Sequence, residues 1–420
     1  MAPPEVSLLE GARALLLNNR KQGYDPVLKR HFSYTCPSRG EYPWQWFWDS
    51  CFHAIALCHI DLNQAKAELR TLLSVQRKDG FIPHVIHWGT GRWSRFHWDL
   101  PAYGQSKFGF GAKASALIQP PVLAQAVLRV VEASQDKDFL RETLDAVRRY
   151  YLWLHDQRDP DGDGLISVIS PYETGMDQLP AYDRVLGAKN PSSLEMHFRD
   201  RVLDLNNLVL GRNYNLDAIF RRDAFNVEDV MMNCIYAQGL RDVSELCALA
   251  GDETAAGGFR NMAGRVEQAV LSKCYDPKDG AFWSLGTRHE QALKVLTVSS
   301  LFPVLLSSID RKRLGELASV IANPSTFGLP YPLPSVAKNE PAFRPNRSFV
   351  IWRGATWVNI NWFIAKGLRS RGLLELSNSL SKRTVEMVAA GGFREFYNPI
   401  TGQGLGARNF GWSTLVVDMP

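Results

Sequence analysis

Two acidic residues stand in segments that are rich in glycine, proline and aromatic residues. Asp177 closes the segment 171–177 (PYETGMD), and Glu395 lies in the segment 391–399 (GGFREFYNP). Such surroundings desolvate a carboxyl group and shift its proton affinity. Cleavage of a glycosidic bond needs one protonated carboxyl to release the leaving oxygen and one ionised carboxyl to activate water or attack carbon. These surroundings therefore predict Asp177 and Glu395 as a catalytic carboxyl pair.

Aromatic residues gather in the segment 42–49 (YPWQWFWD), which contains Tyr42, Trp46, Trp48 and Asp49. Indole faces stack on sugar C–H groups, and the indole N–H stays available as a hydrogen-bond donor. The alternative is that each Trp simply packs in the core. Asp49 also has two interpretations: it caps the start of a helix, or its carboxylate accepts hydrogen bonds from sugar hydroxyls.

Four motifs follow one another over nearly the whole chain and resemble those of glycoside hydrolase family 63. They are W-x-W-D (Trp46, Trp48, Asp49), E-x-G-x-D (Glu173, Gly175, Asp177), W-R-G-x-x-W (Trp352, Arg353, Gly354, Trp357) and E-x-Y-N-P-x-T-G (Glu395, Tyr397, Asn398, Pro399, Thr401, Gly402). The short chain and its segment 18–24 are similar to the bacterial members that hydrolyse mannosylglycerate. The members that hydrolyse glucosylglycerate are their close relatives.

The resemblance implies an inverting α-glycosidase in which Asp177 donates the proton and Glu395 is the general base. Inversion places the two carboxyl groups roughly 6.5–9.5 Å apart, which leaves room for a water molecule. The products would be the free sugar and glycerate, and the residues expected to contact the sugar are Tyr42, Trp46, Trp48, Asp49, Trp352 and Trp357. Two alternatives stay open: another inverting enzyme of this family, such as an oligosaccharide α-glucosidase or a trehalase-like enzyme, and a sugar-binding protein without catalysis. The choice between a mannosyl and a glucosyl substrate also stays open.

A substrate that carries a carboxylate calls for an arginine or for a cluster of hydroxyl and amide donors. We predict Arg212 as the partner of the glycerate carboxylate, with Tyr214 beside it and Gln119 as a second candidate. His84 is expected either to bind a sugar hydroxyl or to be a buried structural histidine. For Arg353 the favoured role is an ion pair that orients a catalytic carboxylate, with direct substrate contact as the alternative. Further arginines remain open as carboxylate partners: Arg201, Arg221, Arg222, Arg344 and Arg347.

No metal or cofactor is expected from the spacing of potential ligands. His84, His87 and His97 lack the spacing of a zinc site. The segment 159–164 (DPDGDG) matches the first half of a calcium-binding EF-hand loop, but the twelfth position, which requires a bidentate Glu, is Ser170. We therefore interpret this segment as a turn.

The charge of the chain is mild and mixed. Its 420 residues carry a formal net charge of +5 that is spread along the sequence, which argues against a nucleic-acid partner. The N-terminal residues lack a basic region followed by an apolar core, no apolar run reaches membrane-spanning length, and the six Cys residues form no C-x-x-C pair. These observations predict a cytoplasmic enzyme with a small-molecule substrate, and they leave a homo-oligomer open.

The sequence predicts that helices position these candidate residues. We expect twelve helices, some strongly apolar and others evenly charged. This pattern predicts an all-α fold, an (α/α)6 barrel. The whole chain, 1–420, is expected to form a single catalytic domain. The segment 165–225 is expected to be an irregular excursion, a lid over the mouth that carries Asp177. The expected helices are 6–18, 47–60, 62–77, 119–134, 137–157, 226–250, 252–274, 294–309, 310–322, 353–371, 373–390 and a short one from about 409.

Overall fold

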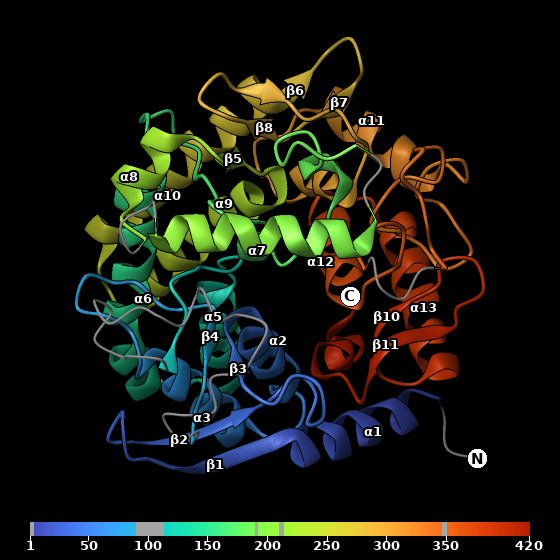
Figure 1. The fold of residues 1–420 in the computed structure, drawn as a ribbon. Helices are drawn as coiled ribbons and strands as arrows, with labels where there is room; N and C mark the ends of the chain where they lie inside the picture. Colours follow the sequence, from blue (N-terminus) through green and yellow to red (C-terminus); the bar gives the residue numbers. More distant parts are fainter. Residues whose placement is uncertain (1–3, 90–112, 190–191, 210–213, 347–350) are drawn as a thin grey trace.

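The computed structural model describes residues 4–89, 113–189, 192–209, 214–346 and 351–420 (Figure 1). This part of the chain is predominantly helical. Its α-helices are α1 (Pro4–Asn19), α2 (Phe47–Leu57), α3 (Leu62–Leu73), α5 (Leu123–Ser134), α6 (Lys137–Arg158), α7 (Ser193–Val209), α8 (Leu216–Arg222), α9 (Val230–Leu249), α10 (Glu253–Ala269), α11 (Arg311–Ala322), α12 (Val358–Ser370) and α13 (Leu374–Gly391). The strands form small antiparallel sheets between helices: β1 (Arg20–Asp25) with β2 (Arg30–Thr35), β3 (Gln45–Trp46) with β4 (Val85–Ile86), β5 (Val227–Glu228) with β8 (Leu285–Gly286) and β9 (Gln291–Ala292), β6 (Tyr275–Asp276) with β7 (Ala281–Phe282), and β10 (Arg394–Tyr397) with β11 (Gly404–Arg408).

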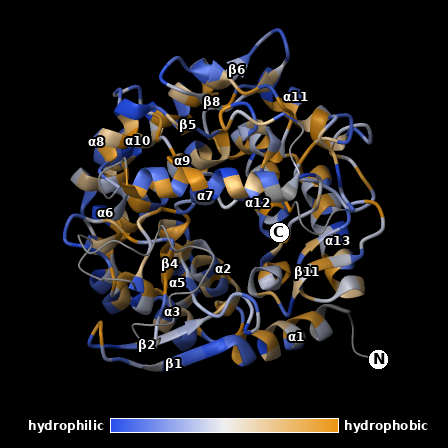
Figure 2. Ribbon diagram, in the orientation of Figure 1, coloured by the Kyte–Doolittle hydropathy of each residue, from blue (hydrophilic) through white to orange (hydrophobic). Residues whose placement is uncertain are grey.

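Six helical elements contact one another in a closed order. α2 contacts α5, α5 contacts α9, α9 contacts the 3-10 helix η6 (Val298–Leu305), η6 contacts α12, α12 contacts the 3-10 helix η7 (Gly411–Asp418), and η7 returns to α2. Every residue of α2 and of η6 is buried. Six further helices, α1, α3, α6, α10, α11 and α13, pack against members of this order, and hydrophilic and hydrophobic stretches alternate along the peripheral helices (Figure 2).

Aspartates begin several of the peripheral helices. The side chains of Asp61, Asp136, Asp252 and Asp310 accept hydrogen bonds from backbone N–H groups in the first turns of α3, α6, α10 and α11. Such caps satisfy donors that have no partner within the helix. The caps and the apolar faces together explain why these helices begin close to where the sequence predicts them.

Two predictions about helices are wrong. The segment around 298–305 is a 3-10 helix rather than part of an α-helix, and Pro303 lies inside it, where proline removes a backbone donor. The excursion 165–225 contains the long helix α7 in place of an irregular path. The apolar side chains of α7 lie on its exposed as well as its buried side, which hides the amphipathic pattern; the exposed ones are Phe198, Val202, Leu205 and Val209.

The helices of the described residues include none that is both long and apolar enough to cross a membrane.

Candidate active site

A cavity of about 370 Å³ brings most of the predicted site residues together. Its lining includes both predicted catalytic residues, Asp177 and Glu395. It also includes these predicted substrate contacts: Tyr42, Trp46, Trp48, Asp49, His84, Gln119, Trp352 and Trp357. One hollow thus holds both predicted catalytic carboxyl groups within largely aromatic walls, as expected for a sugar-cleaving site.

Two predicted contacts are not among the residues that the structure places there. Tyr214 lines a separate, smaller cavity, and its buried hydroxyl donates to the carbonyl of Asp204 at 3.3 Å. Arg212 lies outside the described residues. The structure therefore does not bring Tyr214 to the active-site cavity, because its side chain lines the other cavity and its hydroxyl is bonded to Asp204 of α7.

Glu395 is held by hydrogen bonds on both carboxylate oxygens. It lies in strand β10, not in a loop as the sequence predicted, and the β10–β11 register is irregular at its position. The hydroxyl of Tyr42 donates to Oε1 at 3.0 Å, and the backbone N–H of Ala407 donates to Oε2 at 2.9 Å. Desolvation raises the pKa of Glu395 to about 7, although these two hydrogen bonds act in the opposite direction. A carboxylate with this pKa suits a general base near neutral pH.

A glycine allows the loop of Asp177 to approach Trp48 closely. Asp177 lies in the turn between the 3-10 helices η3 (Pro171–Thr174) and η4 (Pro180–Tyr182). Gly175 has a φ of +66°, and a Cβ at this position would come within 2.5 Å of the Trp48 ring. Any larger residue would therefore push the Asp177 turn away from the indole that helps to line the cavity.

Glu173 is a buried structural anion rather than a catalytic group. It forms a two-pronged ion pair with Arg158, with distances of 2.8 Å and 2.5 Å, and neither side chain is exposed to solvent. Its oxygens also accept the backbone N–H groups of Ile118 at 3.0 Å and Ile169 at 2.8 Å. This set of contacts fixes η3, the helix that precedes the Asp177 turn.

Asp200 is a buried carboxyl within the electrostatic influence of Asp177 that the sequence analysis missed. It projects from α7, it is fully buried, and neither of its carboxylate oxygens has a hydrogen-bond partner among the described residues. Desolvation and the charges of Asp177 and Asp204 raise the pKa of Asp200 to about 8. Asp200 therefore keeps its proton near neutral pH, while the charge that acts on it is that of Asp177. Only recognition of α7 as a helix would have revealed this residue.

Asp49 does not cap α2. The N-cap position belongs to Trp46, and Asp49 lies in the first turn, where it is buried. Its Oδ1 has no hydrogen-bond partner among the residues that the structure describes. Desolvation and the nearby charge of Glu395 raise the pKa of Asp49 well above its usual value. The interpretation as a helix cap is therefore wrong, and the interpretation as a partner for a sugar hydroxyl stays a prediction.

Aromatic and polar side chains complete the walls. Trp352 and Trp357 stack with ring centroids 3.8 Å apart and an interplanar angle of 2°. The side-chain oxygen of Gln119 accepts the backbone N–H of Trp48 at 3.1 Å, so Gln119 also anchors the start of α2. His84 is buried beside Ser115, and desolvation lowers the pKa of His84 to about 3, which leaves it neutral.

Arg353 forms an ion pair away from the two catalytic candidates, whereas Arg201 lines the cavity. The guanidinium of Arg353 pairs with Asp183, with one contact at 2.9 Å, so its ion-pair partner is not one of the two catalytic candidates. Arg201, by contrast, lines the cavity from α7 and lies over the ring of Tyr172, 5.6 Å from its centroid. Of the cavity-lining residues in the described part of the chain, Arg201 is the single Arg or Lys.

The sequence matches a family model over residues 42–413, and its description is "Mannosylglycerate hydrolase MGH1-like glycoside hydrolase domain". The chain belongs to this family of glycoside hydrolases. The resemblance to glycoside hydrolase family 63 that the four motifs carry is therefore confirmed, and the protein is a glycosidase.

Relatives of this glycosidase cover nearly its whole length. It is 31% identical to the mannosylglycerate hydrolase of Thermus thermophilus, over 93% of this chain and 97% of the relative. It is 26% identical to the glucosylglycerate hydrolase of Mycolicibacterium hassiacum, over 90% of this chain and 91% of the relative. The crystal structure of a family 63 mannosylglycerate hydrolase from Thermus thermophilus in complex with Tris and D-glycerate matches with a TM-score of 0.83 at 29% identity, covering 98% of this chain and 99% of that one.

Proposed function

We propose that this glycosidase hydrolyses α-linked mannosylglycerate, glucosylglycerate or both, to the free sugar and glycerate, with inversion at the anomeric carbon. The observation that carries the proposal is the aromatic cavity in which Glu395, with a pKa of about 7, and Asp177 face the same space. The named activities of the full-length relatives support it. A panel of both glycosylglycerates, assayed for released glycerate, tests the substrate class, and release from neither one would refute it.

In this mechanism Asp177 transfers its proton to the glycosidic oxygen as the bond to the anomeric carbon breaks. Glu395 accepts a proton from a water molecule whose oxygen attacks that carbon from the opposite face. The cavity also offers polar groups for the sugar hydroxyls: the indole N–H groups of Trp46 and Trp357 and Oδ1 of Asp49 have no partner among the described residues. Buried polar groups of this kind gain most when a ligand completes their hydrogen bonds.

The proposed architecture is a single domain, 1–420, built as an (α/α)6 barrel. The closed order α2, α5, α9, η6, α12 and η7 supports an inner ring, and the helices that pack against these elements support an outer one. The segment 165–225 covers the mouth in this proposal. Its support is that α7 brings His197 and Arg201 to the cavity wall and lies across the front of the molecule in Figure 1.

The stereochemistry of the first-formed sugar is a direct prediction. An inverting reaction on an α-linked substrate should release the β-anomer, which then mutarotates. Proton NMR during the first minutes of a reaction at high enzyme concentration should show the β-anomeric signal before the α-anomeric one. Early accumulation of the α-anomer would replace this mechanism with a retaining one.

We infer that Arg201 binds the carboxylate of glycerate, since it is the cationic side chain that lines the described cavity wall. Arg201→Ala should lower kcat/KM for the glycosylglycerate by roughly ten- to hundredfold, because a charge-assisted hydrogen bond contributes about 1.5–3 kcal/mol. An uncharged aryl or methyl glycoside of the same sugar should lose little.

The matched control is Arg212→Ala, which removes the arginine that the sequence favoured. If Arg212→Ala shows the charge-selective loss and Arg201→Ala does not, the assignment moves to Arg212. Equal losses of Arg201→Ala on charged and neutral substrates would show that Arg201 supports the cavity and does not bind the carboxylate.

A further inference from the structure

The turn that carries the proposed acid contains a residue in an unfavourable backbone conformation. Gln178, directly after Asp177, is buried and has a φ of +65°. This value lies in the left-handed region, which residues other than glycine rarely adopt. Such a conformation persists only where the surrounding structure holds it in place. The contacts on either side of Asp177 are therefore expected to restrain this turn.

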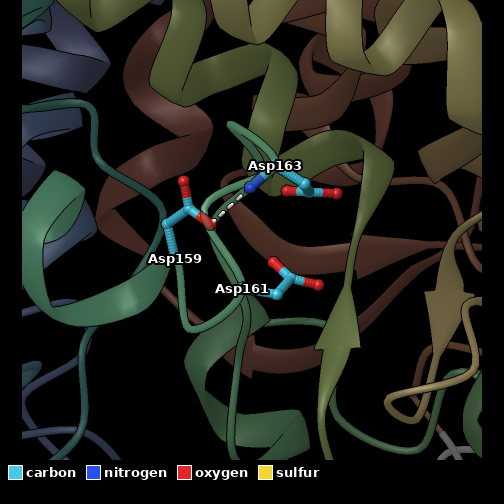
Figure 3. Close-up of side chains that lie close together, drawn as sticks. All are labelled: Asp159, Asp161 and Asp163. Atoms are coloured by element: carbon cyan, nitrogen blue, oxygen red, sulfur yellow. Dashed lines mark hydrogen bonds between the residues drawn. The ribbon is translucent and has the colours of Figure 1, made fainter.

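On the N-terminal side, the restraint is the buried ion pair of Glu173 with Arg158, the last residue of α6. The chain turns directly after Arg158, as the sequence predicts. Here the carboxylate of Asp159 accepts the backbone N–H groups of Asp163 at 3.1 Å and Gly164 at 3.0 Å (Figure 3). These bonds fix the end of α6 and therefore the position of Arg158.

On the C-terminal side, the turn is held through Tyr182, the last residue of η4. Its hydroxyl donates to Oδ2 of Asp229 at 3.0 Å, and neither side chain is exposed to solvent. The ring of Tyr182 packs edge-on against Phe225, with centroids 5.5 Å apart. The ion pair of Asp183 with Arg353 follows directly. Tyr182 is not among the described residues that line the cavity, so any effect on catalysis passes through the turn.

Asp229 links η4 to the closed order of helices. It is the N-cap residue of α9, and its Oδ1 accepts the backbone N–H of Met232 at 3.1 Å. The hydroxyl of Ser284 donates to Oδ2 at 2.9 Å, and that of Ser299 in η6 donates at 3.1 Å. No Arg or Lys pairs with Asp229 in the described part of the chain, so hydroxyls and a backbone N–H stabilise its buried carboxylate. Each of these donors is costly to lose.

We propose that Tyr182 is a positioning residue for the general acid: its hydrogen bond to Asp229 holds the strained turn and thereby directs the carboxyl of Asp177 at the glycosidic oxygen. This inference rests on the proposed function, because it concerns proton donation. A displacement of a catalytic group by about 1 Å can lower a rate by roughly a hundredfold. Glu395 lies on β10, outside this restraint, so the base should keep its place when the hydrogen bond is lost.

Tyr182→Phe tests the proposal, because it deletes the hydroxyl and keeps the ring that packs on Phe225. On a glycosylglycerate, whose leaving group needs a proton, kcat should fall by roughly ten- to hundredfold. On a nitrophenyl glycoside of the same sugar, whose leaving group departs without a proton, kcat should change little. Equal losses on both substrates, or no loss on the glycosylglycerate, would overturn the proposal.

The matched control is Tyr275→Phe, which removes another hydrogen bond from a tyrosine to a carboxylate. The hydroxyl of Tyr275 donates to Glu316 at 2.6 Å, and neither residue is among the described ones that line the cavity. Both rates should stay near the parent values. Asp229→Asn weakens the proposed bond from its acceptor side and should show the same selective loss as Tyr182→Phe. The proposal can thus be tested even if Tyr182→Phe does not fold.

A double-mutant cycle separates this inference from the proposed function. If Tyr182 acts through Asp177, adding Tyr182→Phe to Asp177→Asn should lower the rate on the glycosylglycerate far less than Tyr182→Phe does alone. Losses that simply add would overturn the positioning role while Asp177 remains the acid. Asp177→Asn that shows no dependence on the leaving group would instead refute the proposed acid, and the inference with it.

Discussion

Replacing Glu395 with Gln should lower kcat by roughly 10²–10⁴-fold while the KM for the glycosylglycerate changes little. The amide keeps the size of the side chain and an oxygen that can accept the N–H of Ala407, so the fold and the sugar contacts persist. It cannot take the proton of the attacking water. Steady-state kinetics together with circular dichroism measure both parts of this expectation. Turnover that persists near the parent rate would remove Glu395 from the mechanism.

The pH profile gives this assignment a second readout. The pKa of Glu395 is raised to about 7, and the base must be ionised, so kcat/KM should fall as the pH drops below about 7. Tyr42→Phe deletes the hydroxyl that donates to Oε1 and stabilises the ionised form. The acidic limb of the profile should therefore move to higher pH in this variant. An unmoved limb would show that another group titrates there.

Asp177→Asn distinguishes the acid from the base. A glycoside whose leaving group needs no proton, such as a nitrophenyl glycoside, should retain much more of its rate in this variant than the glycosylglycerate does. Glu395→Gln should lose turnover of both substrates, because both need activated water. The reverse pattern would exchange the roles of the two residues.

The second large effect concerns stability and the buried pair of Glu173 and Arg158. Glu173→Gln should destabilise the fold by about 3–5 kcal/mol, because it leaves the fully buried guanidinium without its anionic partner. Urea unfolding followed by tryptophan fluorescence measures the change. The matched control is Glu142→Gln, which breaks the solvent-exposed pair with Arg70 and should cost no more than about 1 kcal/mol. Similar changes in the two variants would contradict the importance of burial.

The loss should extend to the active site. Glu173 also accepts the backbone N–H groups of Ile118 and Ile169, so its replacement loosens η3 and the turn that carries Asp177. We expect lower kcat in the folded fraction of Glu173→Gln, whereas Glu142→Gln should keep the parent value. Unchanged kcat would show that the turn keeps its position without this pair.

Local sequence patterns predict much of the fold because many helices begin and end through local interactions. Asp61, Asp136, Asp252 and Asp310 are each followed by a helix whose apolar face is visible in the sequence. α7 escaped prediction because solvent-exposed apolar residues such as Phe198 blur its periodicity. The strand position of Glu395 escaped it as well, because β10 and β11 are short and define each other only by pairing.

The candidate site, like the fold, could be predicted only in part from the sequence. Carboxyls and tryptophans that stand in aromatic-rich segments can be recognised from the sequence, and the structure gathers those of the segment 42–49 with Asp177 and Glu395. The partner of Arg353 is Asp183, far away in the sequence, and no local pattern connects them. Asp200 and Arg201 depend on the same missed helix. Pairings that only tertiary structure creates are therefore the part that the sequence did not reveal.

In the proposed mechanism, recognition of the leaving group and cleavage of the bond depend on different parts of the chain, and helix α7 serves only the first. The proposed base lies on β10 and the proposed acid lies in the turn before η4, whereas Arg201 and His197 reach the cavity from the 17 residues of α7. In the proposed mechanism, substitutions on the cavity side of α7 should therefore change the preferred leaving group while the acid and the base stay in place. For an engineer, a combinatorial library confined to the cavity side of α7 is a compact route to glycosidases with new leaving groups.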